Sequence, residues 1–73
     1  MATRFDVVND SGGTVTYQLG ERQYAIGPGV LRTHQQCRRT SLSLQSSRST
    51  LTPSSGTRYR IEQTADGLRL QAE

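Results

Sequence analysis

The chain has 73 residues and a net charge of +3, and all nine of its basic residues are arginine. This length predicts one small domain over 1–73, the single cysteine excludes an internal disulfide, and no apolar run approaches the length of a membrane span. Only 14 residues are Leu, Ile, Val or Phe, so the core is small, and association into a homo-oligomer would enlarge it.

Apolar and polar residues alternate over most of the chain, which is the period of half-buried β-strands. No segment keeps a helical period over three turns. We therefore expect an all-β fold: a small antiparallel β-sandwich of about seven short strands, with a compact β-barrel as the alternative. In chain order, the expected strands lie at 4–9, 14–19, 22–26, 30–37, 40–45, 57–64 and 68–71.

Glycine-containing turns separate several of these strands. Gly20 and Glu21 suit a two-residue type II′ hairpin, which needs a positive φ at its first central residue. In the next break, Pro28 suits the second position of a turn and Gly29 the third. An Asp-Gly pair near the end of the chain indicates another hairpin.

The inward faces of the expected strands define a predicted core. Because side chains alternate between the two faces of a strand, every second residue belongs to it. Its members are Phe5, Val7, Val15, Tyr17, Leu19, Tyr24, Ile26, Leu31, Leu42, Leu44, Tyr59, Ile61, Leu68 and Leu70.

Residues 46–57 are the most biased stretch, because eight of the twelve are Ser or Thr. Such a composition predicts a long polar loop, here with a short edge strand around Leu51. A flexible binding loop is the functional alternative for the same residues.

The run Thr33–Arg39 gathers the lone His34, the lone Cys37 and two adjacent arginines. A nucleophilic Cys-His pair needs contact between the two side chains, but on a strand residues three apart point to opposite faces and lie about 10 Å apart. A structural zinc site needs four ligands, and this pair supplies two. We therefore interpret His34 as a surface imidazole and Cys37 as a small, partly buried thiol packed inward.

No other feature of the sequence indicates catalysis. Four of the six acids lie in or beside expected turns or at the end of the chain, where solvent or local backbone satisfies them. Neither a phosphate-cradling glycine motif nor a nucleophile elbow is present in the sequence. We expect a protein that is not an enzyme and needs no cofactor and no metal.

The distribution of charge is the strongest positive signal. Residues 22–61 hold seven arginines and no acid, whereas 1–21 and 62–73 each have a net charge of −2. Arginine's planar fork suits carboxylate and phosphate. If the strands that carry them share one sheet, a basic face is predicted from Arg32, His34, Arg38, Arg39, Arg58 and Arg60.

This basic face predicts a non-catalytic recognition or structural module that contacts a protein partner, with an acidic partner as the best match in charge. A nucleic-acid-binding module that grips phosphates through the same arginines is the alternative, although the three tyrosines alternate inward and offer no stacking surface. An ordinary solvated arginine face would leave the same pattern. The N-terminal segment lacks the apolar core of a signal peptide, so we expect a cytoplasmic protein, or a module cut from a longer exported one.

Overall fold

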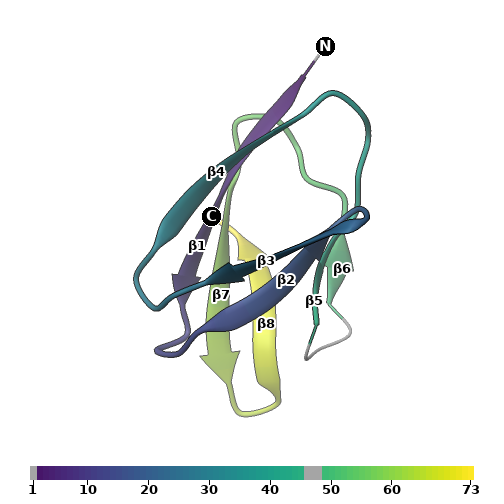
Figure 1. The fold of residues 1–73 in the computed structure, drawn as a ribbon. Helices are drawn as coiled ribbons and strands as arrows, with labels where there is room; N and C mark the ends of the chain where they lie inside the picture. The colour runs from purple at the N-terminus through teal and green to yellow at the C-terminus, as the bar shows by residue number, and fades with distance from the viewer. Residues whose placement is uncertain (1, 46–48) are drawn as a thin grey trace.

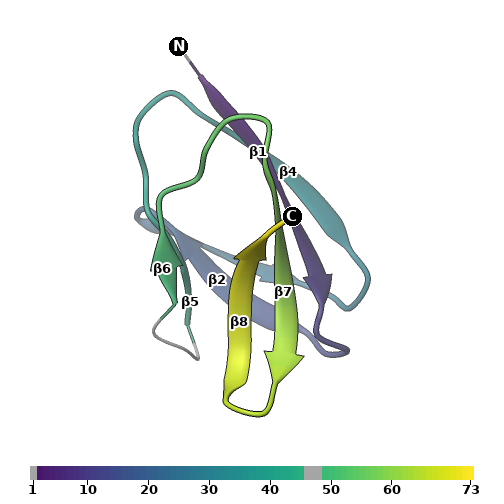
Figure 2. The same cartoon turned by 180° about the vertical axis from the view of Figure 1, so that it is seen from behind.

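The computed structural model describes residues 2–45 and 49–73, and over these ranges the chain forms strands, turns and loops. Within these ranges, eight strands make two four-stranded sheets, in the orders β4-β1-β7-β8 and β3-β2-β5-β6. Figures 1 and 2 show that strands of the two sheets cross one another. The predicted sandwich is confirmed, because the sheets do not close into a barrel. The strands are β1 (Thr3–Asp10), β2 (Val15–Leu19), β3 (Arg22–Ile26), β4 (Leu31–Gln36), β5 (Leu42–Leu44), β6 (Thr50–Leu51), β7 (Arg58–Thr64) and β8 (Gly67–Ala72).

One pairing departs from the predicted antiparallel arrangement. β1 and β7 run parallel, with Asp6 opposite Arg58 and Asp10 opposite Glu62. The other pairings among the described strands are antiparallel. Two parallel neighbouring strands need a long connection between them, which a tight hairpin cannot provide. Here the segment from β2 to β6 connects β1 to β7. The pairing places acidic residues of the N-terminal strand beside arginines of β7.

The turn chemistry read from the sequence is confirmed at two positions. Gly20 has φ +62°, and no described residue other than glycine has a positive φ, so only the first central residue of its hairpin is left-handed, as type II′ requires. Gly29 has φ +75°, and the Val30 N–H donates to the Gly27 carbonyl at 3.2 Å. A Cβ at Gly20 would lie 2.7 Å from Thr40 Cγ2, so this hairpin tip packs closely against the segment after β4.

The core contains most of the residues that strand alternation predicted. The buried apolar cluster comprises Phe5, Val7, Val15, Tyr17, Leu19, Ile26, Leu42, Leu44, Tyr59 and Ile61. Three further predicted core residues, Tyr24, Leu68 and Leu70, are partly buried and pack against this cluster, as does Leu51.

Leu31 is the predicted core residue that the structure places outside, with 42% of its surface exposed. Phe5 is buried and lies opposite His34, so the inward positions of β4 belong to His34 and its even-numbered neighbours. Leu31 lies opposite Val8 on the outer face. The prediction chose the wrong face for this strand, because its single leucine was taken as the inward marker.

Asn9 is a fully buried polar residue that the sequence did not mark. Its amide nitrogen donates to the carbonyls of Gly13 at 2.6 Å and Ile26 at 2.9 Å. Its side-chain oxygen accepts from the N–H and the hydroxyl of Ser11, at 3.0 and 2.6 Å. Every polar atom of the side chain is therefore satisfied, and Asn9 ties the first turn to the end of β3.

The Ser/Thr-rich stretch is held by hydrogen bonds where the structure describes it. The predicted edge strand is β6, which pairs with β5. The Ser54 N–H donates to the Tyr59 hydroxyl at 2.8 Å, and the Gly56 N–H donates to the Arg4 carbonyl at 2.8 Å. Positions 46–48 of the predicted loop lie outside the described residues. Nowhere in the described ranges is there a helix of the length and hydropathy that a membrane crossing requires.

Candidate functional site

An open groove lies between β3 and β4, where Figure 1 shows the two strands running apart from the turn that joins them. Its volume is about 940 Å³. We call it the β3–β4 groove. The tip of the β2–β3 hairpin, the facing strands and segment 37–41 line it: Leu19, Gly20, Glu21, Arg22, Tyr24, Thr33, His34, Gln35, Gln36, Cys37, Arg38, Arg39, Thr40 and Ser41.

Aromatic rings form the floor of this groove. His34 is only 6% exposed, so its prediction as a surface imidazole is wrong. Its Nε2 shares a 2.5 Å hydrogen bond with the hydroxyl of Tyr17, and its ring centroid lies 4.7 Å from that of Tyr24 and 5.5 Å from that of Phe5. Polar atoms that would be costly to bury alone therefore satisfy each other.

The hydrogen-bonded pair in the floor is neutral near pH 7. Burial lowers the pKa of His34, and the nearby Arg32 lowers it further. Burial raises the pKa of Tyr17 to about 12, with Arg32 opposing and Tyr24 adding to the shift. The net charge of the groove therefore comes from its rim and not from its floor.

The rim carries arginines without carboxylate partners. Arg22, Arg38 and Arg39 line the groove, and Glu21 is the one acid among its described lining residues. The Arg32 guanidinium lies above the Tyr24 ring, with Cζ 5.5 Å from the ring centroid, which is a cation–π arrangement. Among the described residues, no ion pair joins any of these four arginines to a carboxylate.

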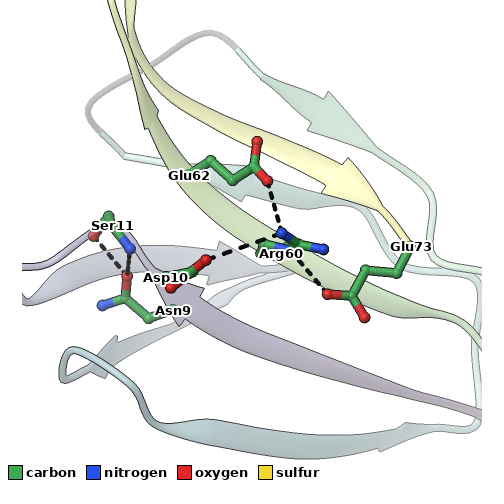
Figure 3. Close-up of polar contacts among 6 residues, drawn as sticks. All are labelled: Asn9, Asp10, Ser11, Arg60, Glu62 and Glu73. Atoms are coloured by element: carbon green, nitrogen blue, oxygen red, sulfur yellow. Dashed lines mark hydrogen bonds and ion pairs between the residues drawn. The ribbon is translucent and has the colours of Figure 1, made fainter.

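The arginines of β7 have the opposite surroundings. Arg60 Nε donates to Glu73 Oε1 at 2.8 Å, and its Nη1 lies 3.2 Å from Glu62 Oε1 and 4.0 Å from Asp10 Oδ2 (Figure 3). The hydrogen bond to Glu73 raises the pKa of Arg60. Arg58 Nε lies 3.7 Å from Asp6 Oδ2. Carboxylates therefore balance both of these charges locally.

The six residues of the predicted basic face do not share one face. Their strands β4 and β7 do belong to one sheet. Arg32 lies opposite the buried Val7, however, whereas Arg58 lies opposite Asp6 on the other side. Arg32 and His34 thus face the groove, and Arg58 and Arg60 face outward. Strand β4 ends at Gln36, so Arg38 and Arg39 lie beyond it.

Cys37 is exposed, which corrects its prediction as a thiol packed inward. It follows the last residue of β4, so strand alternation does not apply to it. It lies at the groove rim while His34 is buried in the floor. Across the described ranges, no group of three or more His, Cys, Asp and Glu residues is placed to hold a metal ion.

Arg22 is the groove arginine that sequence reasoning did not assign to the basic face. The available signal was its position directly after the predicted hairpin tip, at the start of the acid-free stretch.

Comparisons with protein-family models, with curated proteins and with solved structures found no match to this chain.

Proposed function

We propose that the protein is a non-catalytic recognition module whose β3–β4 groove binds an extended acidic segment of a partner protein. The unbalanced charge of the groove carries this proposal: Arg22, Arg38 and Arg39 line it, and none of the three forms an ion pair with a carboxylate among the described residues. A fourth arginine, Arg32, lies over the ring of the lining residue Tyr24 and also has no such partner. A carboxylate can accept two parallel hydrogen bonds from one guanidinium. Such pairs are stronger in a partly enclosed groove than on an open surface.

The groove suits an acidic peptide better than a nucleic acid. Bases of single strands bind by stacking on exposed aromatic rings. Tyr24 is the tyrosine that lines the groove, but the Tyr17 ring stacks on it at 5.6 Å, and the Arg32 guanidinium lies over it. An acidic segment needs no free ring, because guanidinium groups recognise its carboxylates directly.

A matched pair of variants tests the proposal. The probe is a short fluorescent peptide in which Glu and Val alternate, and its binding is followed by anisotropy at low salt. Replacing Arg22, Arg38 and Arg39 together by Gln should weaken binding by at least about tenfold, since three unpaired cations are lost. The control replaces Arg58 and Arg60 by Gln and should change affinity less than about twofold, because their charges are already balanced.

Three results would count against the proposal. Equal losses in the two variants would mean that the groove has no special role. Equal binding of the same peptide with Gln in place of Glu would remove the charge argument. Absence of peptide binding, together with salt-dependent binding to single-stranded or duplex DNA through the groove arginines, would assign them to phosphate recognition.

A further inference from the structure

The edge of β4 that borders the groove has no neighbouring strand among the described residues. Backbone groups of successive residues in a strand point to alternate sides. In β1 the even-numbered residues face β7, because the Asp6 N–H donates to the Thr57 carbonyl at 3.1 Å. The odd-numbered residues face β4, because the Asn9 N–H donates to the Val30 carbonyl at 3.0 Å.

The register of β1 with β4 then fixes which groups of β4 are free. Val7 pairs with Arg32 and Phe5 with His34, so the even-numbered residues of β4 bond to β1. The odd-numbered residues direct N–H and C=O away from the sheet, and within 2–45 and 49–73 no strand pairing or turn hydrogen bond engages them. These residues are Leu31, Thr33 and Gln35. Three donors and three acceptors therefore stand in a row at the spacing of a β-strand.

The two ends of this edge differ in chemistry. Leu31 and Val30 are 42% and 44% exposed at the start of β4. Arg38 and Arg39 line the groove beyond its end. Six strand residues span roughly 20 Å, at about 3.3 Å each. A segment on this edge would therefore meet apolar surface at one end and cations at the other.

We infer that the acidic segment binds as an additional strand on the β4 edge, an inference that rests on the proposed function. Its backbone pairs with Leu31, Thr33 and Gln35, an apolar side chain packs on Leu31, and carboxylates about six residues away reach Arg38 and Arg39. Strand addition takes its affinity from main-chain hydrogen bonds and its specificity from side chains. This mode also explains why a peptide is preferred, since a nucleic acid cannot supply alternating amide donors and carbonyl acceptors.

The edge of β3 is a weaker candidate for the same segment. The Gln45 N–H donates to the Thr16 carbonyl at 3.2 Å, so the even-numbered residues of β2 face β5 and the odd-numbered ones face β3. The β2–β3 register therefore leaves Gln23 and Ala25 as the β3 residues whose backbone N–H and C=O groups point away from the sheet. The β3 edge thus offers two such residues against three on β4, and it has no exposed leucine beside it.

A second copy of the chain is a poorer occupant than an acidic segment. Pairing two β4 edges would bring Arg32, Arg38 and Arg39 of both copies to one interface. Like charges on neighbouring strands destabilise a sheet. Charge complementarity therefore favours the acidic segment.

A proline substitution separates strand addition from simple charge attraction. Gln35→Pro removes an N–H that points away from β1 and leaves the β1–β4 bonds in place, a position at which edge strands tolerate proline. Binding of the Glu-Val peptide should weaken by about tenfold, as expected for one lost hydrogen bond that leaves a carbonyl unpaired. The control, Gln23→Pro, removes an N–H that points away from the sheet at the β3 edge and should change affinity less than about twofold.

Amide hydrogen exchange of the unmodified protein gives a second readout that no folding defect can affect. Saturating peptide should slow exchange at Leu31, Thr33 and Gln35 and leave Gln23 and Ala25 unchanged. Peptide binding without this protection, or unaffected by Gln35→Pro in a folded variant, overturns strand addition while the proposed function stands. Failure of every acidic peptide to bind overturns both. Protection that grows with protein concentration alone assigns the edge to a second copy and overturns the inference.

Discussion

Two groups of arginines lie in different parts of the molecule and differ in their surroundings. On the outer face, Arg60 contacts three carboxylates and Arg58 lies near one. Around the β3–β4 groove, Arg22, Arg38 and Arg39 have no carboxylate partner among the described residues. In the sequence all five belong to one acid-free stretch. Their difference therefore arises entirely from folding.

The parallel pairing of β1 with β7 produces this difference. It sets Asp6 opposite Arg58 and brings Asp10 to the level of Glu62, next to Arg60. The acidic ends of the chain thus balance one part of its basic middle and leave the other part unbalanced. A run of like charge in a sequence consequently identifies a binding surface only after the charges that folding brings to it have been counted.

The two regions also differ in burial, because the groove floor is buried and the arginines of β7 are partly exposed. We therefore expect the largest effect on stability from a substitution in the groove floor. His34→Phe keeps an aromatic ring but leaves the buried Tyr17 hydroxyl without its partner. The free energy of unfolding should fall by about 1–3 kcal/mol, the cost of an unsatisfied buried polar group. Urea denaturation measures it. Adding Tyr17→Phe to this variant removes the orphaned hydroxyl and should restore much of the loss; a double variant no more stable than His34→Phe would contradict the role of the hydrogen bond.

Protonating His34 should lower the free energy of unfolding by less than this substitution does, because the side chain then keeps its place in the floor. Its pKa is lower in the folded protein than the value of about 6.5 in the unfolded chain. The unfolded state therefore takes up the proton more readily, and the stability contributed by the neutral ring is complete above about pH 6.5 and declines as the pH falls below it.

Urea midpoints between pH 7.5 and 5 check this expectation. The decline should be absent from His34→Phe. At alkaline pH, stability should fall as the pH rises. The pKa of Tyr17 is raised to about 12 in the folded protein, so the stability that its neutral hydroxyl contributes is lost as the pH rises above about 10. A midpoint that rises between pH 7.5 and 5 would show that His34 does not titrate as its burial requires.

The sequence predicted the strands and the core well, because alternation and turn residues are local signals. Gly20 and Gly29 marked turns by conformations that glycine adopts readily. The face of β4 was predicted wrongly, because its buried inward residue is a histidine and its leucine is exposed. The tertiary partner Tyr17 satisfies the buried ring of His34 by a hydrogen bond, which strand alternation cannot indicate. The groove was not predictable either, since it depends on which strands form sheet edges, and the parallel β1–β7 pairing is a long-range event.

The smallest expected effect compares single arginines from the two groups. Arg60→Gln removes a hydrogen bond to Glu73 and two further ion pairs, so Tm at low salt should fall by roughly 2 °C. Arg38→Gln removes a cation without a partner and should leave Tm unchanged or raise it slightly by relieving repulsion from Arg39. Added salt screens exposed charges, so the difference between the variants should shrink as ionic strength rises. Equal Tm values at low salt would mean that the carboxylates around Arg60 contribute nothing measurable, and the contrast between the two groups would then matter for binding alone.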